Sequence, residues 1–294
     1  MAKVMVTGCS GFLGYHIVKH LLAQEHEVVG VDKRPMTKVL PTVFIQTDVN
    51  DLTYRDLMGM DYIIHLAWRT NIPDCSRHPE DSTRQNIDMT IHLLEVAKEA
   101  KVKKVFFPST ASQYGKNPTP WTEDMVGQPI EHYSWQKLSC EIACKMYANS
   151  LGLDTVVGRF FQVYGEHQRE DTALAAFIKA RKTGKPITLT ETTAQSSFKS
   201  GQRDFVYAGD LAWAVEILLL SDTEPGGVYN VGSGKITTME DVANAVGGEV
   251  QWIPRREWEV ERHEADITKL KELGWIAQTE VIKWIEDYIQ TQQC

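Results

Sequence analysis

The sequence predicts an α/β protein built on a doubly wound parallel sheet, with a smaller, interwoven C-terminal domain. Two observations carry this prediction. Short, continuous apolar segments alternate with helical patterns from residue 4 to residue 159, which is typical of parallel strands that helices cover on both faces. A glycine-rich turn also joins the first strand to the first helix, as in dinucleotide-binding sheets.

The elements of this first part follow in chain order. The strands are predicted at Val4–Thr7, Glu27–Val31, Val43–Thr47, Tyr62–Leu66, Lys104–Pro108 and Thr155–Arg159. The helices are predicted at Gly11–Gln24, Leu52–Met58, Ser82–Ala100 and Tyr133–Leu151. The ligand crevice of such a sheet lies at the carboxyl ends of its strands.

The pattern weakens after Gly165. It still predicts helices at Ala173–Thr183 and Asp210–Leu220, strands at Pro186–Thr190, Arg203–Tyr207 and Val228–Val231, a polar loop at 191–201 and two later helical stretches. We therefore expect a dinucleotide-binding domain at 1–165, rejoined by about 204–230. Residues 166–203 and 231–294 would form the smaller substrate domain, a cap woven into the first.

Composition excludes several classes of function. The net charge is −8 and no long basic tract occurs, so nucleic acid is not an expected partner. No segment has the roughly 18 uncharged apolar residues that a membrane span needs, and the N-terminus enters a core strand at once, which argues against a signal peptide. Five scattered cysteines are typical of reduced thiols in a cytoplasmic protein. No metal site is expected.

The glycine turn indicates a bound dinucleotide. Gly8, Gly11 and Gly14 have the spacing G-x-x-G-x-x-G, which permits a tight turn, a close approach of the backbone to a pyrophosphate and close packing of helix on strand. The following helix would direct its N-terminal amides at the phosphates. Asp32 ends the next apolar strand, at about the offset of a ribose-binding acid.

A second group of residues indicates chemistry on a hydroxyl or a ketone. Tyr133 and Lys137 are four residues apart, so they share a helix face. A lysine ammonium beside a phenol lowers its pKa, which would make Tyr133 a general base near neutrality. Ser109 and Thr110 follow the strand Lys104–Pro108, where a hydroxyl can bond the reacting oxygen.

In this context the chain resembles the extended short-chain dehydrogenase/reductase family, in its nucleotide-sugar epimerase/dehydratase branch. The resemblance spans essentially the whole chain. It rests on the segments Thr7–Gly14, Asp48-Val49, His65–Ala67, Asn86, Ser109–Gly115, Arg159–Gly165, Gln202–Tyr207 and Tyr229–Gly234.

The resemblance implies NAD as cofactor and a nucleotide-diphosphate sugar, most often a UDP-sugar, as substrate. The implied cofactor contacts are Gly8, Ser10, Gly11, Phe12, Leu13, Gly14, Asp32, Lys33, Asp48, Val49, Leu66, Ala67, Asn86, Ser109, Tyr133, Lys137 and Phe160. The implied substrate contacts are Thr110, Gln162, Arg169, Arg203 and Arg256. The catalytic set is Thr110, Tyr133 and Lys137.

Some residues depart from the family pattern, and they bear on the substrate. Arg203 resembles a phosphate-binding arginine, and Arg255 or Arg256 a second one. Arg169 resembles an arginine that meets a uronate carboxylate, although Glu170 stands where that motif has proline. Gln162 stands where hexose epimerases often have asparagine and uronate epimerases often threonine. These departures leave the sugar open.

The leading interpretation is NAD-dependent epimerisation at C4 through a 4-keto sugar. Dehydratases of this branch carry an acid two positions after the catalytic hydroxyl, where this chain has Ser112, so loss of water lacks a proton donor there. A 4-keto-sugar reductase that uses NAD(P)H is the alternative, since Lys33 and Arg34 could accept a 2′-phosphate that Asp32 would repel. A catalytically silent NAD-sensing scaffold is a second alternative.

The helices Ser82–Ala100 and Tyr133–Leu151 carry more apolar residues than one sheet face needs. In the family these two helices often pair with their mates in a four-helix contact. We therefore expect a homodimer.

Overall fold

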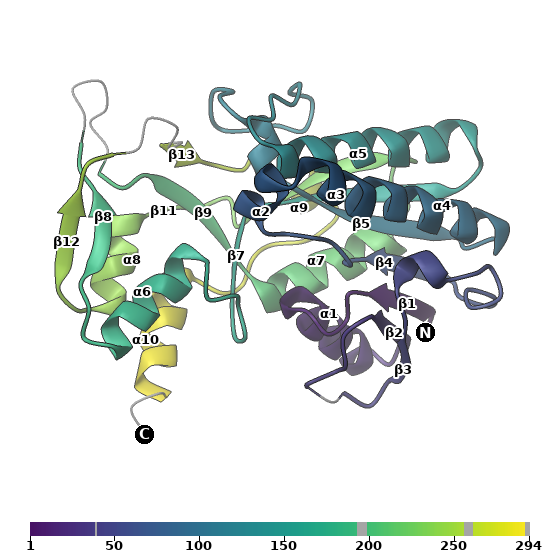
Figure 1. The fold of residues 1–294 in the computed structure, drawn as a ribbon, viewed down its shortest axis with the longest axis horizontal. Coiled ribbons are helices and arrows are strands. Elements are labelled where there is room, and N and C mark those ends of the chain that lie inside the picture. The colour runs from purple at the N-terminus through teal and green to yellow at the C-terminus, as the bar shows by residue number, and fades with distance from the viewer. Residues whose placement is uncertain (39, 193–198, 256–260, 292–294) are drawn as a thin grey trace.

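The computed structural model describes residues 1–38, 40–192, 199–255 and 261–291. Figure 1 shows two lobes: a larger one around the central sheet, and a smaller one that carries β8, β12, α6, α8 and α10. Within the described residues no helix is both long enough and apolar enough to cross a membrane.

The central sheet confirms the doubly wound parallel arrangement. Its strands are β1 (Lys3–Thr7), β2 (Glu27–Asp32), β3 (Val43–Gln46), β4 (Tyr62–His65), β5 (Lys104–Thr110), β6 (Asp154–Phe160) and β10 (Gly227–Val231). They lie in the order β10-β6-β5-β4-β1-β2-β3, and every neighbouring pair is parallel. The order reverses between β1 and β4, and this is where such sheets open a ligand crevice.

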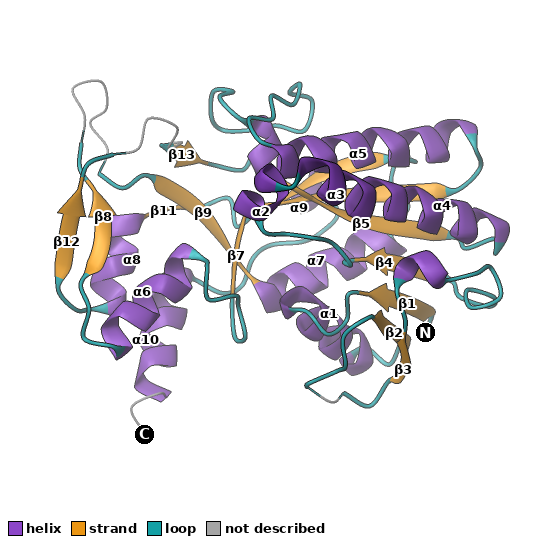
Figure 2. Ribbon diagram, viewed as in Figure 1, coloured by secondary structure: helices purple, strands orange, loops and turns teal. Residues whose placement is uncertain are grey.

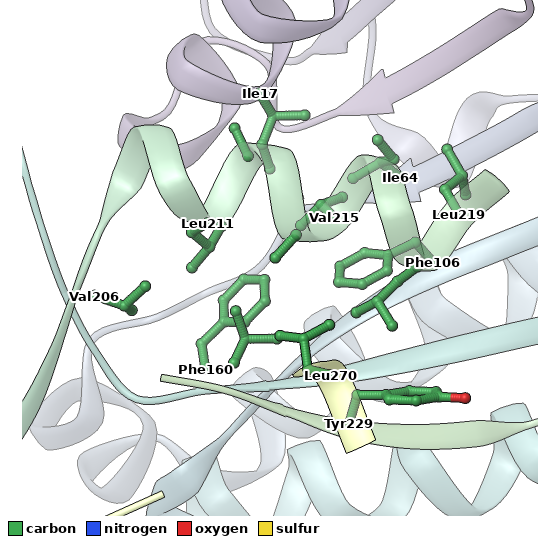
Figure 3. Packing of buried hydrophobic residues seen from close by; sticks show 14 of the residues in the cluster. Ile17, Ile64, Phe106, Phe160, Val206, Leu211, Val215, Leu219, Tyr229 and Leu270 are labelled. Carbon is green, nitrogen blue, oxygen red and sulfur yellow. The ribbon is translucent and has the colours of Figure 1, made fainter. Parts of the chain in front are cut away.

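Helices cover both faces of this sheet (Figure 2). One face carries α1 (Phe12–Ala23) and α7 (Ala208–Leu220), whose apolar side chains share a core with those of the sheet. Figure 3 shows Leu211, Val215 and Leu219 of α7 beside Ile17, Ile64, Phe106 and Phe160. The other face carries α4 (Met89–Glu99) and α5 (His132–Ser150) over a separate core.

The segment that leads into α4 is helical but not uniform. The helix predicted at Ser82–Ala100 runs through α3 (Pro79–Thr83), a π-helical turn at Arg84–Asp88 and then α4. A short helix, α2 (Ile72–Arg77), precedes it and had no sequence signal. Asn71 caps α2 by accepting a hydrogen bond from the Asp74 amide at 2.9 Å, so the loop after β4 is fixed at its far end.

The prediction of a helix at Leu52–Met58 is wrong. The structure has a short 3-10 turn at Val49–Asp51, followed by turns. The carboxylate of Asp56 accepts hydrogen bonds from the amide and the hydroxyl of Thr53, at 2.8 and 2.7 Å. Such local bonds compete with a helix, and Gly59, with a φ of 76°, ends the segment.

The smaller lobe has its own core. In it α6 (Ala173–Lys182), α8 (Met239–Val246) and α10 (Val281–Thr291) pack with the parallel pair β8 (Ile187–Thr190) and β12 (Val250–Ile253). Between the lobes lies a second sheet of β7 (Gln162–Tyr164), β9 (Gln202–Tyr207), β11 (Ile236–Thr238) and β13 (Arg262–His263). Strand β9 joins two cores. Phe205 packs in the core of the smaller lobe, and Val206 packs in the core that α1 and α7 share with the central sheet.

Near its C-terminal end the chain returns to the large lobe. α9 (Thr268–Glu272) and the turn after it insert Leu270 and Trp275, both fully buried, into the first core. Figure 3 shows Leu270 beside Phe160 and Tyr229. This stretch lies inside the range 231–294 that the sequence assigns to the cap, so the two parts are interwoven more deeply than a simple boundary describes.

A buried ion pair joins β6 to α5. The Nη2 of Arg159 lies 2.9 Å from the Oε2 of Glu141, and both side chains are almost fully buried. Nη1 of Arg159 also donates to the Tyr114 hydroxyl at 2.8 Å, and that hydroxyl donates to Asn230 at 2.7 Å. These bonds pair buried polar groups whose desolvation would otherwise destabilise the fold. They also hold α5 in place beneath the candidate site.

Candidate active site

The glycine loop forms one wall of the site. The amide of Gly8 donates to the Val31 carbonyl at 2.7 Å, and Gly8 has a φ of 72°. A Cβ atom at Gly8 would lie 2.6 Å from the Ala67 amide nitrogen, and one at Gly14 would collide with the Gly8 carbonyl. Both positions therefore require glycine, and the loop exposes the N-terminus of α1 to the crevice.

Asp32 lies at the end of β2, beside this loop. It is buried and accepts hydrogen bonds from the amides of Ser10 at 3.1 Å and Arg34 at 2.9 Å. Two amide donors fix the carboxylate at the rim of the crevice, where it can accept from ribose hydroxyls. Lys33 and Asp48 lie nearby, with 3.8 Å between the Lys33 Nζ and the Asp48 Oδ2.

A cavity of about 760 Å³ runs from this wall to the end of β5. Most predicted site residues line it: Gly8, Gly11, Phe12, Leu13, Gly14, Asp32, Lys33, Asp48, Val49, Leu66, Ala67, Ser109, Thr110, Tyr133, Lys137, Phe160 and Arg169. The set combines a glycine cradle, a ribose-directed acid and an apolar floor. It fits a dinucleotide, and no group of side chains suited to a metal ion occurs among the described residues.

The far end of the cavity holds the predicted catalytic hydroxyls. Thr110 ends β5, and its hydroxyl accepts a hydrogen bond from the Ser112 amide at 3.2 Å. Tyr133 lies in the first turn of α5. Glu131 caps that turn by accepting from the amides of Tyr133 at 2.7 Å and Ser134 at 2.9 Å. The cap fixes the start of α5, and thereby the position of Tyr133.

The electrostatics of Tyr133 correct one sequence expectation. Burial raises the pKa of its phenol above the ordinary value, and the charge of Glu131 acts in the same direction. Arg169 and a hydrogen bond with Thr110 oppose this rise. Lys137 is not among the main causes of this shift, so the prediction that its ammonium makes this phenol acidic is wrong.

The Lys137 ammonium is held by a backbone carbonyl and two aromatic rings. Its Nζ donates to the Pro108 carbonyl at 2.6 Å, and it lies 3.7 Å from the centre of the Trp68 ring and 4.6 Å from that of Phe107. The side chain is only 3% exposed. Burial lowers the pKa of Lys137 to about 7, because a desolvated ammonium is disfavoured.

Several predicted contacts do not line the cavity. Ser10 turns its amide to Asp32. Asn86 is fully buried behind the wall, where it accepts from the Arg69 amide at 2.9 Å and donates to Gln136 at 2.8 Å. It therefore supports the loop after β4 from behind.

The predicted phosphate contacts lie toward the cap. Gln162 is on β7 and Arg203 on β9, outside the cavity lining. Nη1 of Arg203 donates to the carbonyls of Gln202 at 2.8 Å and Glu261 at 3.2 Å. Arg256 lies outside the described residues.

The loop after β4 contributes residues that sequence reasoning missed. Trp68, Arg69, Thr70 and Asn71 all line the cavity, together with Tyr133 and Arg169. Nε of Arg69 donates to Asp74 at 2.6 Å. Arg169 contacts Thr70 and pairs with Asp171. The only signal in the sequence was the position of these residues, directly after the strand-end segment His65–Ala67.

The geometry of the site agrees with comparisons to known proteins. Residues 4–232 match the model of the NAD dependent epimerase/dehydratase family. Among curated proteins, the UDP-glucuronate 4-epimerase of Thermodesulfobacterium geofontis is 30% identical over 80% of this chain and 76% of its own.

Two solved structures are similar over nearly their whole length. The UDP-glucose 4-epimerase of Thermus thermophilus, in complex with NAD, has a TM-score of 0.85 at 30% identity, covering 97% of this chain and 96% of its own. The UDP-N-acetylglucosamine 4-epimerase of Methanobrevibacter ruminantium M1, in complex with UDP-N-acetylmuramic acid, has a TM-score of 0.87 at 27% identity, covering 100% and 99%.

Proposed function

Because this chain belongs to the NAD dependent epimerase/dehydratase family and uses NAD as its cofactor, we propose that it epimerises a UDP-sugar at C4. One observation carries the proposal: Thr110, Tyr133 and Lys137 line the same cavity as the glycine loop and Asp32. The names of three of its relatives, each a 4-epimerase of a UDP-sugar, support the choice of reaction and of nucleotide.

The residues at the far end of the cavity have distinct tasks in this proposal. Tyr133, as phenolate, accepts the proton of the C4 hydroxyl, and Thr110 shares the hydrogen bond to the same oxygen. Loss of that proton and of hydride from C4 leaves a 4-keto sugar. Hydride returned to the opposite face, with the proton from Tyr133, gives the epimer. NAD, when bound, supplies the acceptor and the donor of that hydride.

The chain must still lower the pKa of a buried phenol. Arg169 and the Thr110 hydrogen bond already act in that direction, since both favour the charged form. A dehydratase would also need a proton donor near C5, and Ser112, two positions after Thr110, supplies no carboxylic acid. The site therefore lacks the acid that loss of water needs, and C4 epimerisation does not need that acid.

The sugar is proposed only as a class. Arg69 and Arg169 at the cavity wall are each paired with an aspartate, and their remaining N–H groups can donate to a uronate carboxylate or to neutral hydroxyls. UDP-glucose, UDP-N-acetylglucosamine and UDP-glucuronate are the substrates to compare. Each should be tested with the enzyme as purified and with added NAD+ or NADP+. A keto-reductase acting in reverse would oxidise the C4 hydroxyl and accumulate NADH or NADPH, whereas an epimerase would convert the sugar with no net change of cofactor.

The decisive variant is Tyr133→Phe. We predict that it lowers kcat by at least about a thousandfold, since the proton acceptor is lost, while the melting temperature stays within a few degrees of that of the native chain. Conversion of the UDP-sugar is followed by NMR of the anomeric proton. Turnover close to that of the unaltered enzyme would refute the assignment of Tyr133.

We also propose that the chain acts as a homodimer. Trp135, Ile142 and Met146 are 44%, 64% and 48% exposed. Their spacing of seven and four residues puts them on one face of α5. A second copy presenting the same face would bury this stripe.

A further inference from the structure

Trp68, in the loop after β4, packs against the lysine of the active site. Its ring lines the cavity, and the Lys137 Nζ lies 3.7 Å from the ring centre. Phe107 supports it from β5, with ring centres 5.6 Å apart and an angle of 68° between the rings. The ammonium is thus enclosed by two aromatic rings and the Pro108 carbonyl.

The two aromatic rings and the Pro108 carbonyl take the place of a carboxylate counter-ion for the Lys137 ammonium. No carboxylate lies within ion-pair distance of Lys137 in the described part of the chain, although its side chain is nearly fully buried. Along α5 the charged Glu141 faces it and favours the ammonium at longer range, whereas the thiols of Cys140 and Cys144, whose pKa values burial raises, are neutral near pH 7. From β4 it is faced by His65, whose own pKa is lowered to about 3, so that the imidazole is neutral near pH 7.

An indole face attracts a cation, because its π-electrons make the face negative, and the attraction is strongest where water is excluded. We propose that Trp68 is a positioning residue, whose indole face holds the Lys137 ammonium at the reacting end of the cavity. The expected change in the pH profile of kcat rests on the proposed function. The expected change in the pKa of Lys137 does not.

The contact matters because Lys137 changes its protonation state close to neutral pH. With a pKa of about 7, Lys137 is about half protonated at neutral pH. A cation–π contact of this kind corresponds to roughly one pKa unit. Loss of the indole face is therefore expected to lower the pKa of Lys137 by about one unit and to reduce the charged fraction near neutral pH.

The test compares side chains that separate the properties of the indole. Trp68→Phe keeps a π face but removes the N–H, whose nitrogen is buried without a hydrogen-bond partner within the described residues. Trp68→Leu removes both, and Trp68→Met is a flexible replacement in case the leucine variant does not fold. Trp213→Leu is the matched control, because Trp213 packs on α7 outside the cavity lining.

Two readouts are measured on the full chain as purified. Competitive acetylation with acetic anhydride from pH 5 to pH 9, read by peptide mass spectrometry, gives the pKa of Lys137. The pH profile of kcat with UDP-glucose gives a second pKa, that of the step at which activity falls as the pH rises. We expect Trp68→Leu to lower both by about one unit, Trp68→Phe by less than half a unit, and Trp213→Leu to change neither.

Either of two results would overturn the proposal. One is a Lys137 pKa in Trp68→Leu, or in Trp68→Met, equal to that of the unaltered chain. The other is a shift in Trp68→Phe as large as in Trp68→Leu, which would assign the effect to the indole N–H. If no UDP-sugar is turned over, the acetylation result still decides the role of Trp68, so the two failures are distinguishable.

Discussion

His65 illustrates how a titratable side chain at the edge of the site serves structure. The Ala67 amide donates to the Thr7 hydroxyl at 3.2 Å, and that hydroxyl lies 2.9 Å from Nδ1 of His65. On the other side the Thr90 hydroxyl donates to the Asn86 carbonyl at 2.7 Å, so it accepts from Nε2 of His65 at 3.2 Å. The neutral imidazole therefore donates from Nε2 and accepts at Nδ1, so each ring nitrogen has one hydrogen-bonding role.

This arrangement predicts how stability depends on pH. The pKa of His65 is lowered to about 3 in the fold, below the unfolded value of about 6.5. As pH falls through 6.5 the unfolded chain binds the proton first, so stability present above about pH 6.5 is lost toward pH 3. The slope from one histidine reaches about 1.4 kcal/mol per pH unit, and burial of His263 acts in the same direction.

We predict that His65→Asn flattens this slope between pH 6.5 and pH 4.5. Urea unfolding followed by circular dichroism at four pH values measures it. The exposed His132 provides the control, since His132→Asn should keep the slope of the unaltered chain. Identical slopes for His65→Asn and the unaltered chain would contradict a buried neutral imidazole.

At the scale of the elements, the Arg159–Glu141 pair fixes how α5 lies on β6. Removing only the arginine leaves a buried carboxylate without its partner, which costs about 3–5 kcal/mol. We predict that loss for Arg159→Met. The double variant Arg159→Met, Glu141→Leu should recover much of it, because no buried charge then remains unpaired.

Chemical denaturation gives the free energies for this cycle. The exposed pair Lys283–Asp287 on α10 supplies the comparison, and Lys283→Met should change stability by less than about 0.5 kcal/mol. Strict additivity of the two buried substitutions would show that the ion pair does not couple α5 to β6.

The elements differ in how far the sequence determines them. Strands such as β1 and β6 were predicted within one or two residues, because continuous apolar segments identify them without tertiary information. The turns at 52–58 were not predicted, because hydrogen bonds from Thr53 to the Asp56 carboxylate favour a turn over a helix. The cavity's glycine loop and strand ends follow from local sequence. Trp68 and the placement of Lys137 do not, because their contact joins a loop and a helix whose residues are 69 positions apart in the sequence.

At the scale of the whole molecule, the exposed stripe on α5 predicts the assembly state. We expect the native chain to elute as a dimer, and Ile142→Glu to elute as a folded monomer, because a charge in a buried apolar contact is costly. Light scattering coupled to size-exclusion chromatography measures both masses. Ile276→Glu, at an exposed apolar residue away from α5, should remain dimeric. A monomeric native chain would contradict the proposed homodimer.

The return of α9 to the large lobe has a consequence for how the protein is made. A ribosome releases the chain from its N-terminus, so all seven central strands emerge while Leu270 and Trp275 are still untranslated. Until those side chains arrive, the sheet face beneath α7 has an unfilled gap beside Phe160 and Tyr229. The nucleotide-binding half therefore cannot finish folding during synthesis ahead of the cap, and a ribosome-stalled chain ending near residue 265 should remain sensitive to protease.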